Sequence, residues 1–190
     1  MEIQNAQDFQ ALSIARLIMQ AMNYDCCRYF TGPEHTLDDF ERVMTSLVLS
    51  DKSQYSYLNT LVAIDEDGGL CGACVSYDGA RLHELRKAFV DAAKENFGRD
   101  FSSMPDETQA GELYIDSIAV PENCRGKGIA TALLKATVDK ARDMGLPAAG
   151  LLVDTGNPKA EKLYARLGFK TVGDASWGGH AMKHMQYIFK

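Results

Sequence analysis

The turn Arg125-Gly-Lys-Gly-Ile-Ala130 holds the residues of this sequence that are best suited to chemistry. It follows an apolar run that ends at Val120 and leads directly into a stretch with helical spacing. Glycines let a ligand approach the main chain closely, and the first N–H groups of a helix have no partner within it. The positive end of the helix dipole points to the same place. We therefore expect a site for an anion, such as a phosphate or a pyrophosphate group.

Basic side chains surround this turn, although the chain as a whole has a net charge of −6. Arg125, Lys127 and Lys135 suit a ligand with several phosphates, whereas Lys140 and Arg142 are interpreted as part of a solvated helix face. The spacing is that of neither a Walker A loop nor a dinucleotide fingerprint. The turn alone also fits an ordinary strand-to-helix connection, so a second motif is needed to identify the ligand.

The second motif runs from Asn157 to Phe169. Helix geometry explains most of it, with Asn157 as the N-cap, Pro158 at the first helical position and Gly168 at the stop. Tyr164 lies in the apolar stripe of this helix, where a tyrosine is either part of the core or a catalytic group.

Taken together, the two motifs resemble the GNAT N-acyltransferase superfamily. Arg-x-x-Gly-x-Ala follows a strand that ends Ile-Ala-Val, and Asn-x-x-Ala-x-x-x-Tyr-x-x-x-Gly-Phe comes about thirty residues later. The resemblance covers residues 112–174. It implies an enzyme of the acyl-CoA-dependent N-acyltransferase type. Such an enzyme moves an acetyl group from acetyl-CoA to a primary amine of a small molecule or peptide, by direct attack in a ternary complex.

The resemblance also implies which residues bind acetyl-CoA. The strand end pairs with the pantetheine arm, the turn amides hold the pyrophosphate, and the helix N-cap contacts one or the other. The residues concerned are Ile118, Ala119, Val120, Arg125, Gly126, Lys127, Gly128, Ile129, Ala130, Thr131 and Asn157. Tyr164 is implied as the general acid that protonates the departing thiolate. This is a modest task, because a thiol has a far lower pKa than the attacking amine.

The attacking amine needs a group that removes a proton, since alkylamines are mostly protonated at pH 7. Strict alternation along the strand puts five residues on one face: Glu112, Tyr114, Asp116, Ile118 and Val120. Asp116 is the first candidate for the base or for an amine-binding carboxylate, and Glu112 is the second. The alternative for both is an ordinary solvent-facing or ion-paired acid.

The sequence departs from the superfamily pattern at the base. Many members carry a glutamate in the strand before the Asn motif, where this chain has Leu151-Leu-Val153, and the identity of the base stays open. Trp177 either lines the mouth of the acceptor pocket or packs. A histidine of the last strand can assist proton removal, although we favour ordinary exposed strand histidines. Four residues alternate along that strand: His180, Met182, His184 and Gln186.

The cysteines predict neither disulfides nor a metal site. Their odd number, five, argues against a disulfide framework. Cys71-Gly-Ala-Cys74 lies in a strand-like run, where residues three apart point to opposite faces, and no second pair follows at a zinc-like spacing. We interpret both as packing residues. An acyl intermediate on Cys124 lacks an activating histidine nearby in the sequence.

Strand and helix patterns alternate in the second half of the chain, which predicts an α/β fold. The resemblance implies a mixed, largely antiparallel central sheet flanked by helices. Residues 26–35 are expected to form a loop, and 79–111 a helical insertion before the central strand that acts as a substrate-side lid or wall. Helices are expected at 8–22, from 36, at 80–97, 128–144 and 158–167, and strands at 60–65, 70–77, 112–120, 149–153, 169–174 and 181–189.

The length of 190 residues suits one domain, 1–190. The acidic net charge argues against a nucleic-acid surface, and the apolar runs are too short to cross a bilayer. The start Met1-Glu-Ile3 lacks the features of a signal peptide. We expect a cytoplasmic monomer or homodimer whose partner is a small-molecule or peptide amine, with no nucleic acid, membrane or metal.

Two alternatives keep the same donor site. A non-catalytic CoA-binding module, regulatory or for interaction, is favoured by the missing strand glutamate and disfavoured by the intact Tyr164. An acyltransferase for a longer donor, such as succinyl-CoA, is the other.

Overall fold

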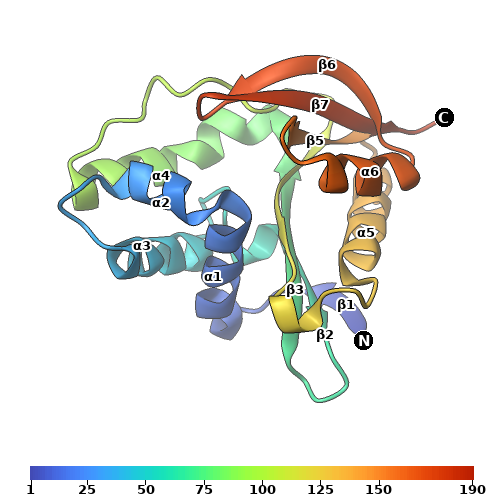
Figure 1. Cartoon of the computed structure of the whole chain (residues 1–190), viewed down its shortest axis with the longest axis horizontal. Helices are drawn as coiled ribbons and strands as arrows, with labels where there is room; N and C mark the ends of the chain where they lie inside the picture. Colours follow the sequence, from blue (N-terminus) through green and yellow to red (C-terminus); the bar gives the residue numbers. More distant parts are fainter.

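A seven-stranded sheet runs through the middle of the computed structural model, which describes residues 1–190 (Figure 1). The strand order is β1-β2-β3-β4-β5-β7-β6, and only the β4–β5 pair is parallel. The expected mixed, largely antiparallel sheet flanked by helices is therefore confirmed. The strands are β1 (Glu2–Asn5), β2 (Thr60–Ile64), β3 (Leu70–Asp78), β4 (Leu113–Ala119), β5 (Ala148–Asp154), β6 (Lys170–Trp177) and β7 (His180–Ile188).

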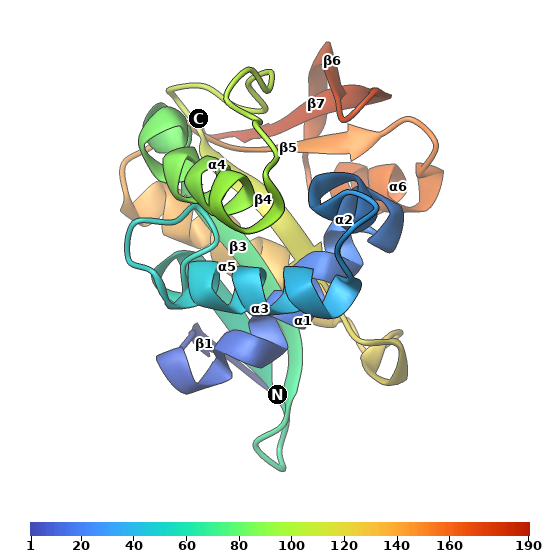
Figure 2. The same cartoon turned by 90° about the vertical axis from the view of Figure 1, so that its left-hand side faces the viewer.

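Helices cover both faces of this sheet. Figure 1 and Figure 2 show α1 to α4 together on one face, and α5 and α6 on the other. Each layer encloses its own hydrophobic cluster, one built around Ile14, Phe40 and Phe89 and the other around Leu133 and Leu151. The helices are α1 (Ala11–Met22), α2 (Tyr24–Thr31), α3 (Leu37–Leu49), α4 (Leu82–Phe97), α5 (Ile129–Asp143) and α6 (Pro158–Arg166).

Two short elements differ from the sequence expectation. Helix α2, residues 24–31, takes up the first part of the expected loop 26–35. It forms because Cys27 and Phe30 bury one side of it and the Asn23 side chain caps its first turn at the Cys26 amide. Strand β1 was not expected. It has only four residues and pairs at the edge of the sheet with β2.

A β-bulge at Asp116 changes the faces of β4. Ile115 pairs with Ser76 and Ser117 pairs with Val75, so Asp116 is an extra residue on its strand. An extra residue reverses the alternation of every side chain that follows it. Tyr114 accordingly packs with α4 residues in one cluster, while Ile118 and Val120 pack with the α5 cluster. The expectation that residues 112, 114, 116, 118 and 120 share one face is wrong for this reason.

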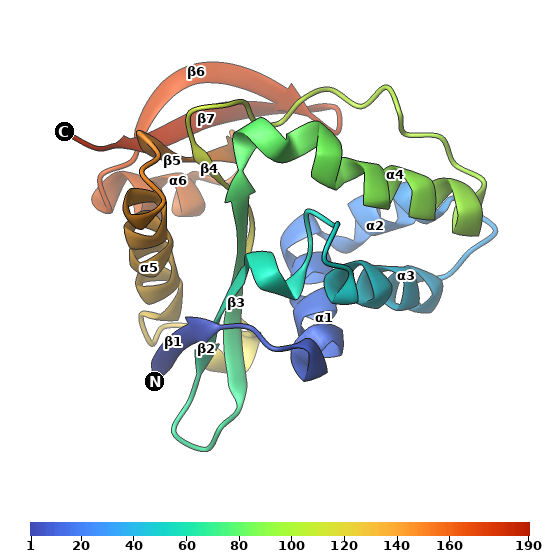
Figure 3. The ribbon, with the colours of Figure 1, turned by 180° about the vertical axis from the view of Figure 1, so that it is seen from behind.

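The insertion 79–111 consists of α4 and a long segment that leads back to β4 (Figure 3). Arg86 of α4 fixes this segment. Its guanidinium donates to the carbonyls of Met104, at 3.1 Å, and Pro105, at 3.0 Å, and pairs with the carboxylate of Glu107. The Arg86 and Glu107 side chains are 7% and 5% exposed, so this ion pair is buried.

We predict that Arg86→Ala lowers the free energy of unfolding by about 3 kcal/mol or more, because it leaves Glu107 charged, buried and without its partner. Urea denaturation measures the effect. Arg81→Ala is the matched control, since Arg81 forms an exposed pair with Glu84 and should change the same quantity by about 0–1 kcal/mol. Equal effects of the two substitutions would contradict the role given to Arg86.

Candidate active site

The β4 and β5 strands pair over only three residues and then part. Their pairing ends at Ile115 opposite Leu151, although β4 continues to Ala119 and β5 to Asp154. Beyond that point the β5-facing edge of β4, residues 116–119, has no strand partner. The backbone N–H and C=O groups of this stretch that point away from β3 can therefore pair with an extended ligand, as an added strand would.

Val120 lies just past this edge, and its carbonyl is already engaged. It accepts hydrogen bonds from Gln20 Nε2, at 3.1 Å, and from Arg125 Nε, at 3.3 Å. Only the Val120 N–H is left for a ligand.

The turn after β4 presents a row of free backbone donors. None of the N–H groups from Gly126 through Thr131 donates to an acceptor in the protein, and no side chain caps α5 at Gly128. Gly126 and Gly128 both have φ of 78°, a conformation that favours glycine. Arg125 differs, because its own N–H donates to the Glu122 carbonyl at 3.2 Å.

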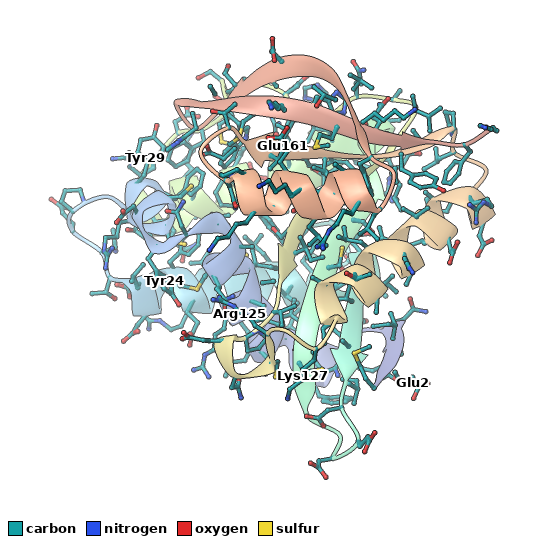
Figure 4. The ribbon with its side chains drawn as sticks, turned by 45° about the vertical axis from the view of Figure 1, so that its right-hand side comes forward. Glu2, Tyr24, Tyr29, Arg125, Lys127 and Glu161 are labelled. Atoms are coloured by element: carbon teal, nitrogen blue, oxygen red, sulfur yellow. The ribbon has the colours of Figure 1, made fainter.

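The basic side chains of the turn remain exposed. Figure 4 shows Arg125 and Lys127 on the turn, on the side of the molecule where α6 lies. Six free amides, the start of a helix and two cations form a site for a multiply charged anion.

Lys140 has a different role from the one expected. Its place in the sequence predicts a solvated residue, but Lys140 is half-buried and its ammonium donates to Ser76 O, at 3.3 Å, and Ser76 Oγ, at 3.2 Å. This burial lowers the pKa of Lys140. Arg142 is exposed, as expected, where it pairs with Asp139 and lies over the Phe189 ring.

The α6 helix starts as its sequence predicts. Asn157 Oδ1 accepts a hydrogen bond from the Ala160 N–H at 3.1 Å, which leaves the Asn157 amide nitrogen free for a ligand. Tyr164 is half-buried against Phe169, with 6.1 Å between the ring centroids.

The Tyr164 hydroxyl has no hydrogen-bond partner in the protein. Burial, with a smaller contribution from the Cys74 thiol, raises the Tyr164 pKa to about 12. Cys74 lies on β3 directly opposite Ile118, so Tyr164 stands near the free edge of β4. Its hydroxyl keeps its proton at neutral pH and is available to donate it.

Asp116 lies at the point where the strands part, on the α4 side of the sheet. Its carboxylate accepts hydrogen bonds from Gln54 Nε2, at 3.0 Å, and Ser117 Oγ, at 2.8 Å. Burial, with a smaller contribution from the negative charge of Glu107, raises the Asp116 pKa to about 7. A carboxyl with such a pKa changes its charge near neutral pH.

Glu112 is fully buried, with 0% of its side chain exposed. Its carboxylate accepts hydrogen bonds from Thr108 Oγ1, at 2.6 Å, and from His184 Nε2 and Gln186 Nε2, both at 2.8 Å. Burial opposes ionisation, but these donors outweigh it and lower the Glu112 pKa. Glu112 therefore has no exposed side-chain surface with which to contact an acceptor.

The two β7 histidines differ from one another. His180 is exposed, as expected, and contacts Asp154 at 3.2 Å. His184 is not an exposed strand histidine, since its side chain is only 17% exposed and bonded to Glu112. Trp177 packs towards α2, with its ring 6.3 Å from that of Phe30, and so links the β6–β7 hairpin to the helical layer.

The cysteines are free thiols. Cys71 and Cys74 are both buried in the α5 cluster, as packing residues. They do not point to opposite faces, because a second bulge at Cys71 shifts the register between Ala63 and Ile64. No group of three or more potential metal-ligating side chains is present, and none of the helices is long and apolar enough to cross a membrane.

Sequence reasoning missed the polar groups that surround the two acids. Gln54 lies 62 positions from Asp116 in the chain, and Glu107 lies in the segment before β4. No local motif marks either of them. The pairing of Glu112 with His184 joins residues 72 positions apart. The only signal was the alternation of polar residues along β7, which showed that His184 and Gln186 share a face.

Known proteins share sequence and fold with this chain. The model of the acetyltransferase (GNAT) family matches residues 19–169. "Acetyltransferase Atu2258" of Agrobacterium fabrum is 35% identical over 100 residues, which are 52% of this chain and 72% of that protein.

Solved structures match over nearly the whole chain. One described as an acetyltransferase has a TM-score of 0.80 and 28% identity and covers 100% of both chains. An N-acetyltransferase from Staphylococcus aureus Mu50 has a TM-score of 0.82 and 23% identity, over 98% of this chain and 100% of its own.

We predict that Asp116→Asn raises the free energy of unfolding by about 2–4 kcal/mol at pH 8. The raised pKa of Asp116 means that the folded protein holds this proton to a higher pH than the unfolded chain. The ionised carboxylate is therefore destabilising above pH 7, and the gain from Asn should shrink as the pH falls towards 4.

Urea denaturation across this pH range measures the effect. Asp39→Asn is the control, because hydrogen bonds from Thr36 lower the Asp39 pKa to about 2 and its replacement should destabilise the protein at pH 7. A gain for Asp116→Asn that does not depend on pH would refute the burial argument.

Proposed function

The chain belongs to the acetyltransferase (GNAT) family, and from this premise we propose that it transfers an acetyl group from acetyl-CoA to a primary amine of a small molecule or peptide. The transfer takes place by direct attack in a ternary complex. The observation that carries the proposal is the parting of β4 and β5, with an anion site at one end and candidate acid and base groups on the two faces.

The donor side fits acetyl-CoA, the cosubstrate of the family. The amides from Gly126 to Thr131 hold the pyrophosphate, assisted by Arg125 and Lys127. The edge of β4 at Ile118, Ala119 and the Val120 N–H pairs with the pantetheine arm, and the free amide nitrogen of Asn157 contacts it. When bound, acetyl-CoA supplies the acetyl group as an activated thioester.

Tyr164 acts as the general acid for the leaving sulfur. Its raised pKa keeps the proton in place until a thiolate needs it. Its position on the α6 side, near Cys74 and the free edge of β4, supports this role.

Asp116 holds the acceptor amine from the opposite face. A half-buried carboxylate attracts an ammonium group, and that group in turn favours the ionised form of Asp116. The residues of 79–111, fixed by Arg86, form a wall of the acceptor pocket rather than a separate unit, and the whole of 1–190 acts as one domain, as a monomer or homodimer.

The competing function is a CoA-binding module without catalysis. Measurement of amine acetylation distinguishes the two functions. The presence of Tyr164 in this chain favours the enzyme. Comparison of acetyl-CoA with succinyl-CoA as donor tests the length of the acyl group.

We predict amine-dependent thiol release from acetyl-CoA, measured with a panel of polyamines, amino acids and peptides with a free N-terminus. Tyr164→Phe should lower kcat by about 10²-fold or more and leave the dissociation constant for acetyl-CoA unchanged, because only the proton donor is lost. Tyr187→Phe is the matched control, since its ring also packs against Phe169, at 5.9 Å between centroids, and has no assigned role.

Binding of acetyl-CoA without turnover of any amine would favour the non-catalytic module. Full activity of Tyr164→Phe would exclude the acid role of Tyr164.

A further inference from the structure

Glu112 is a buried carboxylate whose location is fixed by its surroundings. A Cβ on Gly150 of β5 would overlap the Glu112 carboxylate, so the acid lies directly over the β5 main chain. Gly150 pairs with Gln186, and the next β5 residue on this face, Leu152, pairs with His184. The Glu112 carboxylate therefore connects to β7 through its hydrogen bonds with the His184 and Gln186 side chains.

This arrangement determines which His184 nitrogen carries the proton. Glu112 keeps its negative charge despite burial, and an ionised carboxylate only accepts hydrogen bonds. His184 Nε2 must then be the donor at 2.8 Å. The second ring nitrogen, Nδ1, has no hydrogen-bond partner in the protein and is not fully buried. In the neutral ring it carries a free lone pair.

His184 lies beside the opening between the strands. Its partner Leu152 is the first β5 residue beyond the last β4–β5 pair, and Asp116 is the first such residue on β4. Leu152 packs with Tyr114 and α4 residues, so His184 is on the α4 face of the sheet. Tyr164 approaches from the α5–α6 face.

We propose that His184 Nδ1 takes the proton from the acceptor amine, and that Glu112 is a positioning residue that orients the ring and fixes its tautomer. The proposal rests on the proposed acetyl transfer, and it gives Asp116 the binding of the amine and His184 the removal of its proton. A buried carboxylate paired with a histidine is an arrangement that fixes one tautomer and strengthens the base.

The protons and electrons balance in this scheme. The acceptor enters as an ammonium ion and gives one proton to His184 Nδ1, which leaves a lone pair on nitrogen. That pair forms the bond to the acetyl carbon while the carbon–sulfur bond breaks and the sulfur takes the Tyr164 proton. The second proton lost by nitrogen restores Tyr164, and the imidazolium releases its proton to solvent.

Other titratable groups reach this face without bonding to His184. Tyr114 of β4 lies within the electrostatic influence of Glu112, Asp116, Glu107 and Arg86 of α4. None of the last three bonds to the His184 ring, so Glu112 is the one charge that acts on it through a hydrogen bond.

The test combines kinetics with nitrogen NMR. His184→Gln should lower kcat at neutral pH by about 10²-fold or more, with acetyl-CoA binding unchanged, and the loss should shrink at high pH as free amine becomes available. Glu112→Gln should lower kcat and let both His184 tautomers appear in the ¹⁵N spectrum, because an amide can donate to Nε2 as well as accept from it. His180→Gln, on the same strand and exposed, is the control and should match wild type.

The ¹⁵N spectrum of the wild-type protein tests the tautomer independently of any acceptor. It should show a protonated Nε2 and a bare Nδ1 for His184 at pH 8. A protonated Nδ1, or a His184→Gln variant with wild-type kcat and pH profile, would overturn the proposal. Failure of wild type to turn over any amine would instead contradict the proposed function, and urea denaturation of each variant separates loss of folding from loss of chemistry.

Discussion

The parting of β4 and β5 after the Ile115–Leu151 pair is the constraint on which the rest of the structure depends. A sheet that opens in its middle leaves backbone groups without partners, and such groups are stable only when a ligand or water satisfies them. The bulge at Asp116 lies at that point and reverses the faces of the residues that follow. Ile118 and Val120 therefore pack on the α5 side, while the Asp116 carboxylate lies on the α4 side. One break in the ladder therefore produces both a docking edge and two distinct sides.

Three acidic side chains lie buried or half-buried around this opening, and hydrogen bonds or an ion pair offset the cost of burying each one. Glu112 receives three hydrogen bonds and stays charged, whereas Asp116 receives two and has a pKa of about 7. Arg86 neutralises Glu107 and holds the long segment after α4 against the sheet. Glu112 and Asp116 lie near one another in the sequence but differ in chemistry because of their surroundings. Glu112 is a fixed anion, and Asp116 titrates near neutral pH.

Local pattern predicted most of the fold, because the helices and strands of this chain carry regular periodicity and ordinary caps, such as Thr36 and Asn157. The donor site was also predictable, since the turn after β4 binds through backbone amides and its glycines are visible in the sequence. Alternation failed at Asp116 and Cys71, where an inserted residue leaves no mark in the sequence. The partners of the two acids were beyond prediction as well, because contacts such as Glu112 with His184 arise only when distant strands pair.

The central claim is that the opening between β4 and β5 is the acetyl-CoA site, with donor and acceptor on opposite faces of the sheet. Amide hydrogen exchange with and without acetyl-CoA tests this most directly. We expect new protection from Gly126 to Thr131, whose amides have no partner in the protein, and at those amides of residues 116–119 that face away from β3. Unchanged exchange there, with protection instead in the surface hollow lined by Arg28, Tyr29 and Arg99, would contradict it.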